Sequence, residues 1–154
     1  MSLEELLQSR VIRKIKPDHN LALKSLTRAG RDIDTAKTLS SNEKFDWALA
    51  VSYNAMLVAG RVLMFNKGYR SSSTEGHVAV VRFLQATLGT QTSNRMIMVM
   101  NGTRKKRHRI VYEEMDIVSE DEARQTVKWA EEFVQTISNI IRRQASHKRT
   151  PRLR

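Results

Sequence analysis

One short basic segment, TRKKRHR, and the residues just after it hold the side chains best suited to chemistry. Arg104, His108 and Tyr112 are spaced by four, so on a helix they stand on one face. Arg107 and Arg109 flank that face. The spacing therefore predicts a titratable imidazole and a phenol standing among guanidinium groups.

Such a group of side chains suits the cleavage of an RNA phosphodiester. Breaking that bond through the neighbouring 2′-hydroxyl needs a base, positive charge for the crowded phosphorane and an acid for the leaving oxygen. Arginine binds phosphate by paired hydrogen bonds, and histidine exchanges protons near neutral pH. Tyrosine, with a pKa of about 10, is a poor base but can donate a hydrogen bond or stack on a base. The alternative is a basic helix face that is only solvated.

The positive charge of the chain is concentrated in two places. Lysine and arginine number 27 against 16 acidic residues, which gives a net charge of +11. The TRKKRHR segment holds five basic residues and the C-terminal stretch 142–154 holds six, so the rest of the chain is neutral. This distribution predicts contact with a polyanion at defined places. Solubility and an unstructured tail are the alternative explanation.

Several classes of site are excluded or disfavoured. The chain has no cysteine, which rules out disulfides, thiolate metal sites and cysteine nucleophiles. It has no glycine-rich phosphate loop and no HExxH motif. His19, His77 and His147 stand singly, and we expect His77 to face solvent on a first helical turn. No metal or cofactor is expected.

The sequence favours a cytoplasmic protein without a membrane segment. The first residues carry Glu4 and Glu5 and lack the apolar core of a secretory signal. The longest apolar stretch, 48–65, is interrupted by Arg61, and a spanning helix needs about 20 mostly apolar residues. We interpret this stretch as a buried core helix.

The apolar spacing predicts an all-α, up-and-down bundle of four to five helices. Asp18 opens the first long helix and Asn42 begins the second, which ends before Gly68. A loop follows, and Thr74 caps a third helix. Ser119 and Glu122 form the capping box of the last. The expected domain covers residues 1–144, and 145–154 form a basic, disordered tail.

Residues 92–113 fit two structures. The apolar run MIMVM followed by Asn101-Gly102 is typical of a hairpin, with residues 110–112 returning as a strand. The spacing of Met96, Val99 and Thr103 is helical instead. An isolated hairpin is marginally stable, so we predict a helix with a break or kink near Gly102.

Two segments of the chain resemble the HEPN domain family. SYNAMLVAGRVLM, with the Lys-Gly and Ser/Thr-rich loop after it, is similar to the central helices of HEPN domains. TRKKRHRIVYEE, followed by SEDEARQTVKWAEEFVQTI, resembles the segment with the family's Arg-polar-x-x-x-His signature and the final helix. The resemblance covers roughly residues 18–141.

The resemblance implies a homodimer whose cleft holds the signature residues of both protomers. Many relatives are metal-independent ribonucleases that act as toxins or defence proteins, and many are encoded beside a small nucleotidyltransferase that binds them. By position, Arg107 is the signature arginine, His108 the polar residue, and Tyr112 stands where the family has histidine. The candidate catalytic residues are thus Arg107, His108 and Tyr112. The candidate nucleic-acid contacts are Arg104, Lys105, Lys106 and Arg109.

Two functions remain open from the sequence. In the first, the protein binds RNA and cleaves it by metal-independent acid–base chemistry. In the second, it is a non-catalytic helical module that docks on a small nucleotidyltransferase. Because Tyr112 replaces the signature histidine, whether the protein is an enzyme stays open, with a metal-independent endoribonuclease as the activity to test.

Overall fold

A computed structural model describes residues 1–72 and 76–149, and for residues 92 and 146–149 it describes only the backbone. The described part is mostly helical, as the sequence predicts. Its elements are α1 (Leu3–Gln8), β1 (Ile12–Lys14), α2 (His19–Ser41), α3 (Phe45–Lys67), β2 (Tyr69–Ser71), α4 (Gly76–Thr87), α5 (Thr90–Tyr112) and α6 (Glu120–Arg149).

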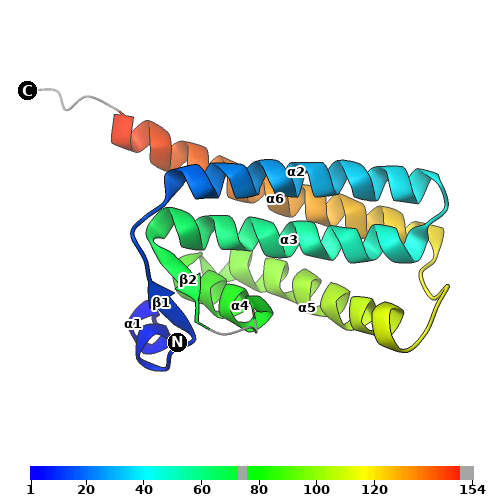
Figure 1. Ribbon diagram of the computed structural model, residues 1–154, viewed down its shortest axis with the longest axis horizontal. Helices are drawn as coiled ribbons and strands as arrows, with labels where there is room; N and C mark the ends of the chain where they lie inside the picture. Colours follow the sequence, from blue (N-terminus) through cyan, green and yellow to red (C-terminus); the bar gives the residue numbers. More distant parts are fainter. Residues whose placement is uncertain (73–75, 150–154) are drawn as a thin grey trace, which may run out of the picture.

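Helix α3 is the centre of an up-and-down bundle. It packs against α2, α4, α5 and α6, and Figure 1 shows α2, α3, α5 and α6 lying side by side along the long axis. By length and composition α3 is apolar enough to cross a membrane, but 72% of its most apolar window is buried inside the protein. A helix that is apolar on most sides gains most when other helices cover it. The prediction of a buried core helix is therefore confirmed.

The boundary between α2 and α3 differs from the prediction. Asp18 caps α2 as expected, with its carboxylate accepting the N–H of Leu21 at 2.9 Å. Asn42, expected to begin α3, instead ends α2, and its N–H donates to the carbonyl of Thr38. Glu43 then takes a left-handed φ of 61°, which turns the chain before α3 begins. Asparagine is favoured at both kinds of helix end, so the sequence alone did not decide between them.

A small sheet near the N-terminus was not predicted. Strands β1 and β2 pair antiparallel, with Ile12 opposite Ser71. Gly68 ends α3 as predicted, at a left-handed φ of 88°, and its carbonyl accepts the N–H of Ile15 at 2.9 Å. The expected loop after Gly68 therefore begins as a strand. A strand of three residues is too short to show the alternation of apolar and polar residues by which strands are recognised in a sequence.

Helix α5 is continuous, so the predicted break near Gly102 is wrong. Both Met100 and Thr103 are buried beside it, and the Thr103 hydroxyl donates to the carbonyl of Val99 at 2.8 Å. A glycine costs a helix only about 1 kcal/mol relative to alanine, which packing on both sides of it can offset. Thr74, the predicted cap of α4, lies outside the described residues.

Helix α6 begins as predicted and ends later than predicted. The N–H of Glu122 donates to the hydroxyl of Ser119 at 3.1 Å, as in a capping box. The helix continues to Arg149, so the expected tail 145–154 starts as helix. Extending an existing helix costs little, because each added residue gains a hydrogen bond without a new nucleus. Residues 150–154 lie outside the described part.

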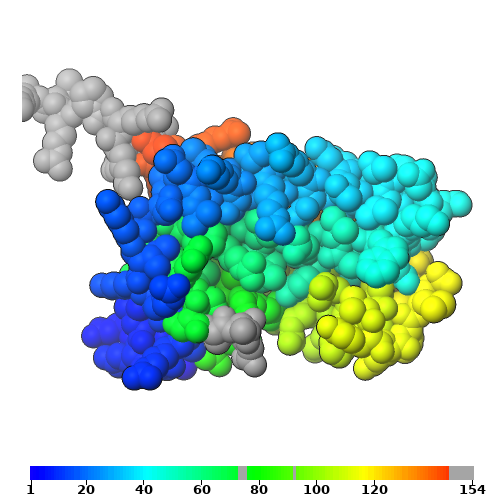
Figure 2. Space-filling model, in the orientation of Figure 1, coloured from blue at the N-terminus to red at the C-terminus, as the bar shows by residue number. Residues whose placement is uncertain are grey.

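The loop between α5 and α6 is fastened to the beginning of α3. Both carboxylate oxygens of Asp46 accept backbone N–H groups, from Asp116 at 2.7 Å and from Val118 at 3.0 Å. Val118 is buried with Ala48, and Figure 2 shows the yellow end of α5 and this loop against the cyan beginning of α3. This attachment fixes how α5 lies along α3.

Candidate nucleic-acid site

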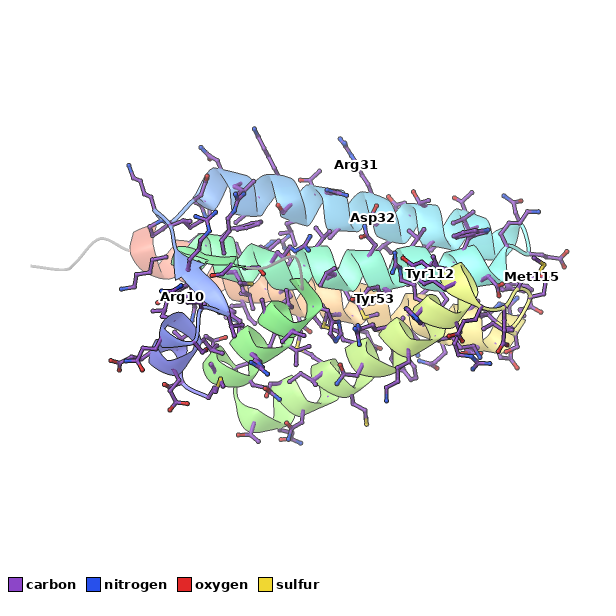
Figure 3. All side chains as sticks on the ribbon, turned by 60° about the horizontal axis from the view of Figure 1, so that its bottom comes forward. Arg10, Arg31, Asp32, Tyr53, Tyr112 and Met115 are labelled. Atoms are coloured by element: carbon purple, nitrogen blue, oxygen red, sulfur yellow. The ribbon has the colours of Figure 1, made fainter. Side chains whose placement is uncertain are left out.

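A polar cavity of about 340 Å³ opens between α3, α4 and α5. Helix α4 can approach α3 closely because Gly60 has no side chain; a Cβ there would lie 2.3 Å from a methyl carbon of Val80. Figure 3 shows Tyr53 on the side of α3 that faces α5. The lining residues with functional side chains are Tyr53, Asn54 and Arg61 of α3, His77 of α4, and Arg104 and Arg107 of α5.

His77 is held between two side chains from different helices. Its Nδ1 lies 2.9 Å from the Tyr53 hydroxyl oxygen and its Nε2 lies 2.8 Å from Oδ1 of Asn101. Burial lowers the pKa of His77, the hydrogen bond with Asn101 raises it, and the nearby charge of Arg104 lowers it further. The expectation that His77 faces solvent is therefore wrong, because the first turn of α4 is packed between α3 and α5.

Tyr53 lies under the guanidinium groups of the cavity. The guanidinium carbon of Arg107 is 5.5 Å from the centre of the Tyr53 ring, a cation–π arrangement. Burial raises the pKa of Tyr53, while the charges of Arg104, Arg107 and Arg61 lower it, and the net shift is upward. The phenol is consequently protonated at neutral pH and can donate a hydrogen bond.

The positive charges of the cavity form no ion pair with an acidic side chain of the described residues. None of the ion pairs among the described residues involves Arg61, Arg104 or Arg107. Arg61 reaches across to α4, where a Cβ on Gly76 would lie 2.5 Å from its Nη2. Guanidinium groups that converge without carboxylates are suited to bind a phosphate group with paired hydrogen bonds. Within the described residues, no three histidine or acidic side chains lie close enough together to hold a metal ion.

The site residues predicted from the basic segment lie in two different places in the structure. Arg104 and Arg107 line the cavity, whereas His108 and Tyr112 do not. These two rings contact each other on the exposed surface, with ring centres 4.9 Å apart and planes tilted by 44°, as their spacing of four predicts. Figure 3 places Tyr112 near the end of α5.

The other three predicted nucleic-acid contacts differ in whether their charge is engaged in an ion pair within the protein. Lys105 is exposed. Lys106 forms an ion pair of 3.4 Å with Glu122 of α6, so it is less available to bind a phosphate. Arg109 pairs with Glu114 at 3.0 Å on the surface, where ion pairs are weak and readily exchanged.

Three residues of the site were not predicted from sequence: Tyr53 and His77, which line the cavity, and Asn101, which is hydrogen-bonded to His77. Each lies 24 positions from its partner in the hydrogen-bonded series, so no local spacing connects them. One signal was present, since Arg61 stands alone in an apolar helix and needs either solvent or a partner. In the structure Arg61 lies where α3 lines the cavity.

The fold and the cavity define a small helical-bundle protein with an arginine-lined cavity. Residues 22–141 match the profile of the HEPN domain family, so the chain belongs to that family. HEPN domains are a family of ribonucleases often found in toxin and defence systems. No curated protein and no solved structure matches the chain in the corresponding searches.

Proposed function

We propose that the protein binds RNA along α5 and cleaves it at the cavity without a metal ion. The observation that supports this most is the convergence of Arg61, Arg104 and Arg107 beside a half-buried imidazole, with no carboxylate among the described residues that line the cavity. A phosphodiester carries one negative charge, and the phosphorane formed during attack by the 2′-hydroxyl carries about two. Fixed guanidinium groups therefore favour the transition state over the bound substrate.

The surface beside the cavity is suited to hold the rest of an RNA strand. Lys105 and Arg109 are exposed and supply charge for neighbouring phosphates. The exposed rings of His108 and Tyr112 are tilted by 44° to each other, and each offers a face on which an unpaired base can stack. We propose this supporting role for His108 and Tyr112, while Arg107 contacts the reacting phosphate.

The proposal is tested with a mixed single-stranded RNA incubated in EDTA. We expect the protein to cleave it and to leave 2′,3′-cyclic phosphate ends, because the attacking group is the 2′-hydroxyl. An Arg107→Ala protein purified in parallel should cleave at least about 100-fold more slowly, which excludes a contaminating nuclease. Binding should weaken steeply as the salt concentration rises. In a plot of the log of the binding constant against the log of the salt concentration, each phosphate contact should contribute about −0.7 to the slope. Intact RNA with the unmodified protein would remove the enzyme claim.

We further propose that the protein is a homodimer. Apolar side chains are exposed where α3 begins and just after α5 ends: Trp47 is 55% and Met115 81% exposed. A second copy that covers them would remove this apolar surface from water. Sedimentation at micromolar concentration should then give twice the mass of the 17.7 kDa chain.

A monomer at high micromolar concentration would contradict the dimer. In that case the second candidate function gains support, because the same exposed residues would suit a small nucleotidyltransferase as the partner. Co-purification of the chain with the product of a neighbouring nucleotidyltransferase gene distinguishes the two partners.

A further inference from the structure

We propose that His77, acting through the Tyr53 hydroxyl, is the proton acceptor for the reaction at this cavity. The inference rests on the proposed RNA cleavage and names the residue pair that removes the proton from the attacking 2′-hydroxyl. It is carried by the hydrogen-bonded series Tyr53–His77–Asn101, which joins three helices at the place where the arginines converge.

The hydrogen bonds select one form of the neutral imidazole. Oδ1 of Asn101 can only accept, so Nε2 of His77 carries the hydrogen and donates it over 2.8 Å. Nδ1 is then unprotonated and accepts the hydrogen of the Tyr53 hydroxyl over 2.9 Å. The acceptor nitrogen of His77 is thus connected to the cavity through Tyr53.

A proton can move along this series without breaking it. The ribose 2′-hydroxyl gives its proton to the Tyr53 oxygen while Tyr53 gives its own proton to Nδ1 of His77. The bond between the 2′-oxygen and phosphorus forms, the bond from phosphorus to the 5′-oxygen breaks, and the leaving oxygen takes a proton from water. Tyr53 ends as a phenol and His77 as an imidazolium, which donates to the Tyr53 oxygen and to Asn101. The water that protonated the leaving oxygen is left as hydroxide, and this takes the extra proton of His77 and restores the neutral imidazole.

The charges around His77 are consistent with this direction of transfer. The charged or titratable groups at this site in the described residues are Arg61 and Tyr53 of α3 and Arg104 and Arg107 of α5; Asp32 of α2 is hydrogen-bonded to Asn54 in the cavity wall at 2.9 Å. Burial and Arg104 lower the pKa of His77, so the imidazole is neutral before substrate binds. The extra negative charge of the phosphorane then stabilises the imidazolium as it forms.

His108, the proton carrier expected from the sequence, provides a matched comparison. It is the histidine of the basic segment and lies on the same helix as Arg104 and Arg107, but its ring contacts that of Tyr112 in an exposed position outside the cavity. A general base must come within hydrogen-bonding reach of the proton it accepts. The geometry therefore favours His77 over His108.

The experiment compares His77→Asn, Tyr53→Phe and the control His19→Asn with the unmodified protein. Single-turnover cleavage with protein in excess measures the reaction, and fluorescence anisotropy with a 2′-deoxy RNA analogue measures binding. Removing the base should slow cleavage by about 100-fold or more in His77→Asn, with binding nearly unchanged. Tyr53→Phe keeps the aromatic ring and removes the relay hydroxyl, so it should also slow cleavage. His19→Asn is the matched control, because His19 also contacts an asparagine, with its Nδ1 2.9 Å from Oδ1 of Asn66, but does not line the cavity. It should keep the rate within about threefold.

The pH profile separates a proton acceptor from a structural residue. In the unmodified protein the rate should rise with pH and level off once His77 is neutral, at a pH below the ordinary range for histidine. In His77→Asn that levelling should disappear, whereas loss of packing alone would lower the whole profile without changing its form. Circular dichroism checks the fold, and Tyr53→Phe decides the matter if His77→Asn is unfolded.

Two results would overturn the inference in distinguishable ways. Cleavage by His77→Asn at the unmodified rate and with the unmodified pH profile would overturn the role of His77 and leave RNA cleavage standing. Absence of cleavage by the unmodified protein would remove the proposed activity and this inference with it.

Discussion

A protein with both Arg104→Ala and Arg107→Ala is expected to cleave RNA about a thousandfold more slowly at saturating RNA. One donor aimed at the charge that develops in a transition state contributes about 10²–10³ to the rate. In the proposed mechanism the two guanidinium groups bind the same phosphate, so their joint removal should reduce the rate by less than the product of the two single reductions. Both side chains line the cavity and lack an acidic partner in the described structure, so neither is needed for an ion pair within the fold.

Lys105→Ala with Arg109→Ala is the matched control for this pair. It removes the same number of positive charges from the same helix, but from side chains that do not line the cavity. We expect it to weaken RNA binding and to reduce the salt slope by about 1.4, that is, by two phosphate contacts on a single strand. The rate at saturating RNA should stay near the unmodified value. Equal loss of that rate in the two double variants would mean that general charge, and not the cavity, promotes the reaction.

Phe83→Ala is expected to lower the free energy of unfolding by about 3–5 kcal/mol, which is the usual cost of emptying a fully buried phenylalanine site. Phe83 is completely buried on α4, and its ring centre lies 5.6 Å from that of Tyr69 in β2. The residue therefore ties α4 both to the core and to the small sheet. Urea unfolding followed by circular dichroism measures the change. Cleavage should fall as well, because α4 carries His77.

Phe65→Ala tests whether burial is the cause. Phe65 is only half-buried at the end of α3, where the guanidinium carbon of Arg70 lies 5.4 Å from its ring centre. Its removal leaves a site that water can fill, so we expect a smaller loss, of about 1–2 kcal/mol. A loss for Phe83→Ala no greater than that for Phe65→Ala would contradict the assignment of Phe83 to the centre of the core.

Much of the fold follows from local sequence. Asp18, Gly68 and Ser119 mark helix ends because their backbone and side-chain preferences act within one turn. The apolar spacing between these ends predicts amphipathic helices and one central buried helix, and the matched HEPN region, 22–141, agrees with the resemblance seen over roughly residues 18–141. Asn42 is equally suited to begin or to end a helix. There the predicted order of the helices is right, but the predicted boundary between α2 and α3 is wrong.

The site depended on tertiary structure to a greater extent. The sequence correctly predicts that His108 and Tyr112 share a face of a helix, since that follows from the helical repeat alone. It does not predict which face turns inward, because that is fixed by the rotation of α5 against α3. Asp46 contributes to that rotation by holding the loop after α5.

The sequence by itself determined the helices, the basic segment and the family. Only the packing of α3, α4 and α5 brought His77 to Tyr53 and both of them to Arg107. The physical reason is one of range: helix caps and apolar spacing act over a few residues, whereas the meeting of side chains from three helices depends on how their surfaces fit together. Gly60 illustrates this, because its missing side chain matters only once Val80 lies against it.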